Sequence, residues 1–92
     1  MNVIEDELKQ ALDKTLETVD APALRVIRPD TNLFEHLDSL SVVDMLLEAE
    51  SRLESVTGRY VTLADETMFD ASKSPLRSWR GWVAYVEARH EQ

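Results

Sequence analysis

The sequence contains no cysteine. A chain without cysteine forms no disulfide bond and offers neither a thiolate nucleophile nor sulfur ligands for zinc. It also has no long hydrophobic run: its apolar stretches are only a few residues long, whereas a membrane-spanning helix needs about 20 residues. Nothing at its start resembles a signal peptide. We therefore expect a soluble cytoplasmic protein.

Proline and glycine are scarce as well, with three prolines and two glycines. Pro22, Gly58 and Pro75 stand at apparent boundaries between elements, which suits a helical bundle. Gly81 is the exception, because it lies inside a helical pattern, opposite the apolar face. At 92 residues the chain is long enough for one small domain, residues 1–92, and too short for a deep catalytic cleft.

Basic residues are few, and the formal net charge is −8. The excess of acids lies in residues 1–50, since residues 51–92 hold acids and bases in equal number. An acidic surface argues against nucleic acid and anionic membranes as partners. It favours a partner with a basic docking patch, although the charge could also serve solubility alone.

Apolar residues at helical spacing predict an all-α domain with three longer helices and a short third one. The helices are expected at 3–19, 39–54, 63–69 and 75–90. The connection 21–38 is too apolar for a free linker, so we expect it to be ordered and packed over the core. A sheet is not expected.

The apolar faces define the expected core. In the first helix the face comprises Ile4, Leu8, Ala11, Leu12, Leu16 and Val19. In the second helix it comprises Leu40, Val43, Leu46 or Leu47, Glu50 and Leu53, with Asp44, Glu48 and Glu54 on the outward side. In the last helix it comprises Leu76, Trp79, Val83 and Val86, with Trp82 at the edge and Tyr85 further round.

Side chains suited to helix ends accompany these patterns. Ser74 followed by Pro75 is expected to open the last helix. Ser39 is a candidate N-cap of the second helix, because its hydroxyl can accept a hydrogen bond from a first-turn N–H. Residues 60–62 could form a strand, but no second strand is available to pair with it.

The most informative segment is residues 30–50, which places Asp38-Ser39-Leu40 where an ordered loop enters a helix. The free N–H groups and the positive dipole end of a helix favour a phosphate attached at such a serine. The same arrangement also describes an ordinary helix cap. On these three residues alone, both interpretations stay open.

The wider segment resembles the phosphopantetheine-attachment motif of the acyl and peptidyl carrier protein family, whose core is Asp-Ser-Leu at the start of the second helix. The resemblance extends upstream through residues 30–35 and downstream through alternating apolar and acidic residues to Leu53. The order of the predicted helices is also similar. The resemblance implies the four-helix bundle of the acyl-carrier type.

The resemblance further implies that Ser39 is the attachment point of a 4′-phosphopantetheine arm. A phosphopantetheinyl transferase would take the arm from coenzyme A, and Asp38 would orient the site near that enzyme's magnesium ion. The arm's thiol would hold an acyl, polyketide or aminoacyl group as a thioester. A ligase would load this cargo, and transferases or synthases of fatty acid or secondary metabolite biosynthesis would receive it. The chain itself would not be an enzyme.

A docking face for these partners would be formed by Leu40, Asp44, Met45 and Glu48, with apolar side chains in the centre and acids around them. We expect the carrier to be a monomer. No residue has a base, an orienting group and a pocket around it, so an enzyme is not indicated. His36 and His90 are far apart in sequence and predict no metal site.

Three features depart from the family pattern. His36 stands where the family commonly has glycine, and it is either a plain surface residue or a contact to the arm's phosphate. The stretch 53–61 is longer than usual, which indicates an extended second helix or a larger loop. The last helix is unusually aromatic: Trp79 is expected in the core, whereas Trp82 could cover the core or contact a partner or the cargo. These features indicate a specialised carrier.

Two other interpretations remain. In the first, the chain is a noncatalytic acidic interaction module in which Ser39 only caps a helix. In the second, it is a carrier-like domain that has lost its modification and acts as a scaffold.

Overall fold

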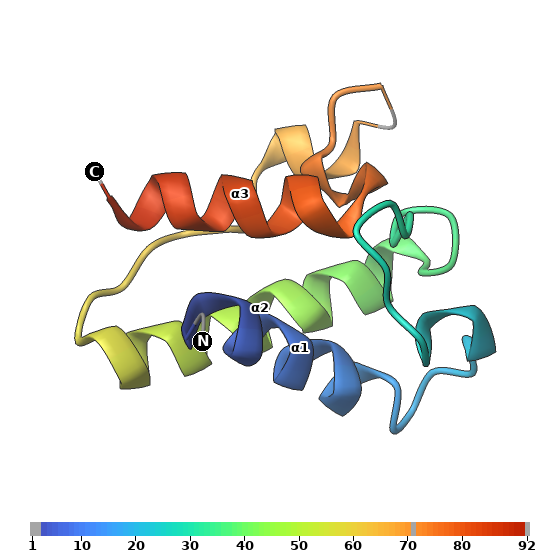
Figure 1. Cartoon of the computed structure of the whole chain (residues 1–92), viewed down its shortest axis with the longest axis horizontal. Coiled ribbons are helices and arrows are strands. Elements are labelled where there is room, and N and C mark those ends of the chain that lie inside the picture. The colour runs from blue at the N-terminus through green and yellow to red at the C-terminus, as the bar shows by residue number, and fades with distance from the viewer. Residues whose placement is uncertain (1–2, 71, 92) are drawn as a thin grey trace.

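A computed structural model describes residues 3–70 and 72–91, and this part of the chain contains three α-helices (Figure 1). They are α1 at Val3–Thr15, α2 at Ser39–Thr57 and α3 at Trp79–His90. Figure 1 shows α2 and α3 running in the same direction and α1 running against them.

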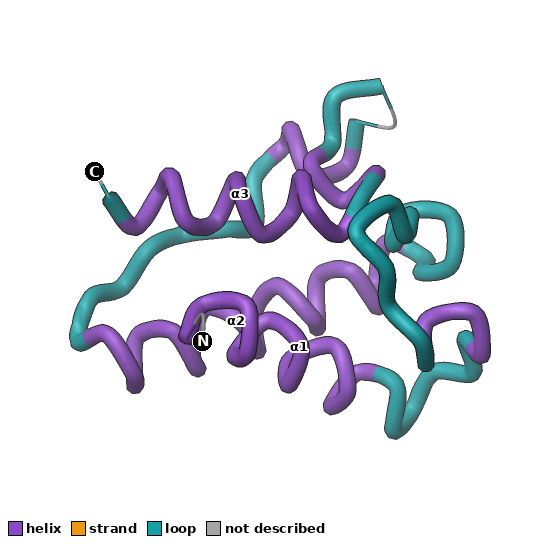
Figure 2. The backbone as a smooth tube through the Cα atoms, in the orientation of Figure 1, coloured by secondary structure: helices purple, strands orange, loops and turns teal. Residues whose placement is uncertain are grey.

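The remaining regular structure consists of short 3₁₀ segments: η1 at Pro22–Leu24, η2 at Glu66–Phe69 and η3 at Pro75–Arg77. Figure 2 shows no strand in the described residues, so the all-α class is confirmed and the possible strand at 60–62 is wrong. The helix predicted at 63–69 is only the four-residue 3₁₀ segment η2.

One apolar core joins the three helices and the long connection. The helices supply these buried side chains: Leu8, Ala11, Leu12, Val42, Met45, Leu46, Ala49, Leu53, Trp79, Trp82, Val83 and Val86. The connection 21–38 adds Leu24, Leu33 and Leu37. The prediction that this connection is ordered and packed on the core is therefore confirmed.

Helix α1 is shorter than the predicted 3–19. After Leu16, the N–H groups of Glu17 and Thr18 donate to carbonyls three residues back, at 3.2 Å, and the helix tightens into turns. Pro22 disfavours helical geometry in the residue before it, which limits how far the helix can run. The predicted apolar face is otherwise correct.

Helix α2 is longer than the predicted 39–54. It ends at Gly58, which has φ of 75° and donates its N–H to the Glu54 carbonyl at 2.8 Å. Glycine adopts this left-handed conformation without steric cost. Of the two explanations for the long stretch 53–61, the extended helix is the correct one.

The core stripe of α2 was predicted in the wrong phase. Leu40 is 71 % exposed, and Val43 is only half-buried. The buried stripe begins instead at Val42 and continues through Met45 and Ala49. The predicted and observed stripes share Leu46, Glu50 and Leu53, so the sequence pattern alone did not separate them.

The predicted helix 75–90 is divided at Ser78. Ser74 caps η3 rather than the long helix, accepting from the Leu76 N–H at 3.1 Å. Ser78 then adopts an extended conformation and caps α3 by accepting from the Gly81 N–H at 3.0 Å. A second serine therefore performs the predicted capping role.

Candidate functional site at the start of α2

Ser39 is the first residue of α2, and Asp38 is its N-cap. Asp38 Oδ1 accepts from the Ser41 N–H at 2.8 Å. Ser39 is exposed, and its hydroxyl makes no hydrogen bond within residues 3–70 and 72–91. The prediction that Ser39 is the helix cap is therefore wrong, because the aspartate before it takes that position.

The hydrogen bond from the Ser41 backbone N–H lowers the pKa of Asp38 below its ordinary value. The capping group is therefore a carboxylate at neutral pH. The N–H groups of Ser39 and Leu40 have no acceptor in the described part of the chain. They lie at the positive end of a 19-residue helix, where a phosphate is favoured.

This arrangement fits a phosphate ester on Ser39. The hydroxyl is exposed, two N–H groups next to it are unpaired, and the cap does not involve the serine.

The approach to Ser39 is fixed by backbone hydrogen bonds. Leu33 and Phe34 both donate their N–H groups to the Leu76 carbonyl, at 2.9 and 3.2 Å. Leu37 is buried and anchors the turn, whereas Leu40 on the other side of Ser39 is exposed. Of the two leucines that flank Asp38 and Ser39, only Leu37 therefore fixes the turn to the core.

His36 is exposed in the same turn, and its N–H donates to the Leu33 carbonyl at 3.2 Å. The position therefore belongs to a turn whose backbone does not need a glycine, since no described residue other than Gly58 has a positive φ. Its imidazole makes no hydrogen bond or ion pair with a described residue, so its relation to a phosphate stays a prediction.

The expected docking face is exposed in part. Leu40 and Asp44 are exposed, and Glu48 is partly exposed. Met45 is only 1 % exposed and belongs to the core, so its side chain is not available to a partner. Leu47, 53 % exposed, lies two helical turns after Leu40 and takes the apolar role on this surface.

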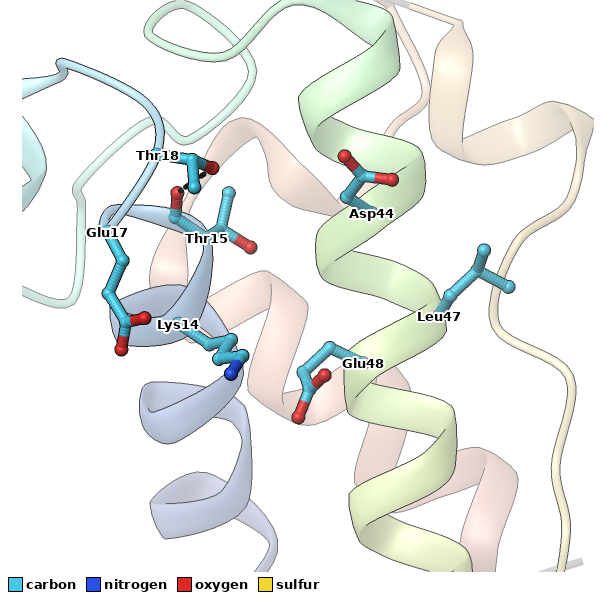
Figure 3. Close-up of a pocket in the computed structure, with 7 residues that line it drawn as sticks. All are labelled: Lys14, Thr15, Glu17, Thr18, Asp44, Leu47 and Glu48. Carbon is cyan, nitrogen blue, oxygen red and sulfur yellow. Dashed lines mark hydrogen bonds between the residues drawn. The ribbon is translucent and has the colours of Figure 1, made fainter.

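We call Leu40, Asp44, Leu47 and Glu48 the outer face of α2. Figure 3 shows Asp44 and Glu48 on the flank toward α1 and Leu47 on the opposite flank. The acids border an open hollow of about 490 Å³ between the two helices, which Glu17 also lines. The surface is thus apolar along one line and acidic beside it.

Glu48 is already engaged within the molecule. Its Oε2 lies 2.8 Å from Nε of Arg52, which is one helical turn further along α2, and the two side chains form an ion pair. The Nε–H of Arg52 is not aligned for a hydrogen bond. Arg52 also donates to Gln10 on α1 at 3.0 Å. Asp44 has no such partner among the described residues, so it is the freer acid of the outer face.

Glu50 is the main polar residue whose hydrogen-bond partners the sequence did not reveal. It is 4 % exposed, which agrees with its place in the predicted apolar stripe. Its carboxylate accepts from the Tyr60 hydroxyl at 2.6 Å and from the N–H groups of Leu63 and Ala64 at 2.7 and 3.0 Å. The sequence signal for these bonds was the occurrence of an acid within an apolar stripe, because a buried carboxylate needs hydrogen-bond donors.

These hydrogen bonds hold residues 59–65, which we call the strap, against α2. On its other side the strap is bonded to α3. Tyr85 donates its hydroxyl to Asp65 at 3.0 Å, and Arg89 Nε donates to the Thr62 carbonyl at 3.1 Å. Figure 1 shows the strap leaving the end of α2 and passing along α3.

The two tryptophans of α3 are both buried but differ in their hydrogen bonding. Trp79 is in the core as predicted, and its Nε1 donates to Glu5 Oε2 at 2.8 Å. Trp82, expected at the edge of the core, is 0 % exposed. Its Nε1 has no acceptor in the described residues.

Groups of acidic or histidine side chains that could hold a metal ion are absent from residues 3–70 and 72–91. Within the same residues, no helix has the length and apolar character needed to cross a membrane. Comparison of the chain with protein-family models, with curated proteins and with solved structures gave no match. The resemblance to carrier proteins therefore rests on the residues of segment 30–50 and on the order of the helices.

Proposed function

We propose that this chain is a cytoplasmic carrier protein that bears a phosphopantetheine arm on Ser39. The proposal includes the bundle type: α1, α2 and α3 would correspond to the three long helices of the acyl-carrier bundle, and η2 to its short third helix. The resemblance of segment 30–50 is its starting point, and the geometry at Ser39 supports it.

The free hydroxyl of Ser39 carries the proposal. If Ser39 only capped the helix, its hydroxyl would be expected to accept a first-turn N–H, and Asp38 accepts that N–H instead. The serine is left exposed at the positive end of α2 with no structural partner in the described chain. Such a residue can be esterified without loss of the helix cap.

The residues around Ser39 would then have separate tasks. Ser39 Oγ forms the bond to phosphorus, its proton leaves to the transferase, and adenosine 3′,5′-bisphosphate is released from coenzyme A. Asp38 holds the start of α2 and would approach the transferase's magnesium ion. When bound, the arm supplies the thiol that the cysteine-free chain lacks, and an acyl, polyketide or aminoacyl cargo is held on it as a thioester.

The outer face of α2 is the proposed docking surface for the transferase and for the enzymes that load and receive the cargo. Leu40 and Leu47 offer apolar contact, while Asp44 offers an unpaired charge. A basic partner would be steered to this surface, and the steering would weaken with salt.

Intact-mass measurement tests the proposal directly. The purified chain is incubated with coenzyme A, magnesium and a broad-specificity phosphopantetheinyl transferase. We expect a gain of one phosphopantetheine unit that is lost in Ser39→Ala. Ser51→Ala is the matched control, because Ser51 is an exposed serine on the same helix. Absence of any gain with several transferases would overturn the proposal.

The same reaction tests the docking surface. Asp44→Lys is expected to lower the transferase kcat/KM about tenfold at low salt and less at high salt, because a steering charge is reversed. Glu54→Lys, an equal change at an exposed position ten residues further along α2, is the control. Equal effects of the two changes would show that only net charge matters.

A noncatalytic interaction module is the second candidate, and the acidic outer face is the observation that favours it. This candidate predicts binding of a basic partner that is indifferent to Ser39→Ala and no mass gain. A carrier-like scaffold that has lost modification gives the same mass result. Modification of Ser39 would therefore separate the carrier from both.

A further inference from the structure

The turn that leads into Ser39 is tied to a distant part of the chain at one point. We call residues 33–38 the approach turn. The N–H groups of Leu33 and Phe34 donate to the Leu76 carbonyl of η3 at 2.9 and 3.2 Å. Within residues 3–70 and 72–91, no other hydrogen bond joins the approach turn to a residue outside loop 21–38 and α2. The Leu76 carbonyl is therefore the distant polar anchor of this turn.

Ser74 holds the backbone on both sides of this anchor. The Ser74 hydroxyl accepts the Leu76 N–H at 3.1 Å, and the Ser74 carbonyl accepts the Arg77 N–H at 3.3 Å. These two N–H groups belong to the two peptide groups that flank Leu76, so one residue fixes both. Pro75, which lies between Ser74 and Leu76, has a fixed φ and further limits the freedom of η3.

The side chain of Ser74 is buried, although serine is mostly an exposed residue. Its exposed fraction is 1 %, and its own N–H donates to the Asp70 carbonyl at 2.7 Å. A buried hydroxyl needs a hydrogen-bond partner, and here the partner is the backbone of η3. The side chain is thus not available to a partner protein, and an effect of it on Ser39 would pass through Leu76.

The approach turn carries this restraint toward Ser39. His36 donates its N–H to the Leu33 carbonyl at 3.2 Å, and the side chains of Leu33 and Leu37 are both buried. Asp38 then caps α2. A continuous series of hydrogen bonds and buried side chains therefore leads from η3 to the residue before Ser39.

We propose that Ser74 is a positioning residue for the modification of Ser39, because it keeps the approach turn in the one arrangement that the transferase binds. The proposal rests on the proposed carrier function. Loss of the Ser74 hydroxyl frees the Leu76 N–H and lets η3 move, so the approach turn samples several arrangements. A transferase that binds one of them then finds it in only a fraction of the molecules, and its apparent affinity falls in proportion.

The kinetic signature of this role is a change in one constant. Ser74→Ala should raise the transferase KM for the carrier roughly two- to tenfold, the range that corresponds to one hydrogen bond. The kcat and the KM for coenzyme A should be unchanged, because the bound arrangement and the enzyme are unaltered. A purely structural role would lower stability and move none of these constants while the protein is folded.

Ser78→Ala is the matched control, because Ser78 loses the same kind of cap four residues later, where its hydroxyl accepts the Gly81 N–H of α3. Initial rates of modification are measured by intact mass at several carrier concentrations, under conditions where circular dichroism shows each variant to be folded. Pro75→Gly, which loosens η3 at a half-buried position, is the second variant. It should raise the same KM, and it replaces Ser74→Ala if that variant does not fold.

Hydrogen exchange of the unmodified ¹⁵N-labelled chain measures the approach turn itself. Each rate is taken relative to that of the Leu46 amide in α2, which corrects for general loss of stability. We expect the Leu33 and Phe34 amides to exchange roughly two- to tenfold faster in Ser74→Ala than in wild type, and at the wild-type rate in Ser78→Ala.

The outcomes separate this proposal from the carrier function. Unchanged exchange in Ser74→Ala, or faster exchange with an unchanged KM, would overturn the positioning role and leave the carrier function intact. An equal rise of KM in Ser78→Ala would overturn it in the same way. Absence of modification in the wild-type chain would remove both proposals.

Discussion

Replacement of Glu50 by leucine would remove the acceptor that holds the strap while keeping a similar side-chain volume. The N–H groups of Leu63 and Ala64, which donate to Glu50 Oε2 at 2.7 and 3.0 Å, would lose their partner. Each buried donor left unpaired costs about 1–3 kcal/mol. Because Leu63 is fully buried and Ala64 half-buried, we expect a loss of about 2–4 kcal/mol in the free energy of unfolding.

Glutamine at the same position should be much milder. Its amide oxygen can accept both backbone N–H groups, and its amide nitrogen can donate to the Tyr60 hydroxyl, which lies 2.6 Å from Glu50 Oε1. Only the charge assistance of the hydrogen bonds is lost. We expect a loss of about 1 kcal/mol.

Urea unfolding at pH 7, followed by far-ultraviolet circular dichroism, measures the loss in the free energy of unfolding for both variants. We expect the dependence of this free energy on urea concentration to be unaltered. Glu54→Leu is the control, because Glu54 is an exposed acid one turn further along α2. It should change stability by no more than about 0.5 kcal/mol. A loss below about 1 kcal/mol for Glu50→Leu would refute the reasoning, because two unpaired N–H groups cost more than that.

Three further results are expected. In thermal or urea unfolding, Asp38→Ala should lower the unfolding midpoint, whereas Ser39→Ala should not. The reason is that only the aspartate caps α2. The difference in the free energy of unfolding between wild type and Asp38→Ala, called the gap below, should be greatest above the ordinary aspartate pKa. Since folding lowers the pKa of Asp38, the gap should close as pH falls through its folded value, and a gap that grows on acidification would contradict the sign. Gly81→Ala should lower the stability measured by urea unfolding, although alanine is intrinsically favoured over glycine in a helix by about 1 kcal/mol. The reason is steric: a Cβ at this position would lie 2.9 Å from the capping Ser78 Oγ and 3.2 Å from the Pro75 carbonyl oxygen. Increased stability of that variant would show that the cap can move aside.

Periodicity in the sequence was sufficient to predict the three α-helices and the buried face of α1 and α3. It was insufficient for α2, where leucines and valines occur on two faces. Leu40 and Leu47 are exposed, while Met45 faces the core. Composition cannot rank two apolar stripes of one helix, because the choice depends on which neighbours cover each stripe.

The position of Ser39 at the start of α2 was predictable from the sequence. That Asp38, and not Ser39, caps the helix was not predictable. Serine and aspartate are both favoured N-caps, and adjacent candidates differ only by where the helix begins. The roles of Glu50 and Gly81 likewise depend on contacts across the fold. Glu50 bonds a strap ten or more residues away, and Gly81 makes room for a serine and a carbonyl in the preceding turn.

The capping of α2 by Asp38 instead of Ser39 explains how the helix could tolerate modification of the serine. If Ser39 capped α2, attachment of a phosphate would remove the cap and fray the helix that carries the proposed docking surface. Because Asp38 accepts from the Ser41 N–H and the Ser39 hydroxyl takes no part, esterification of Ser39 would leave the cap in place. The start of α2 should therefore be the same in both states, and a partner would recognise one outer face throughout the cycle. Amide resonances of α2 beyond its first turn should accordingly be unchanged by phosphopantetheinylation, whereas extensive shifts along α2 would show that the cap depends on the serine.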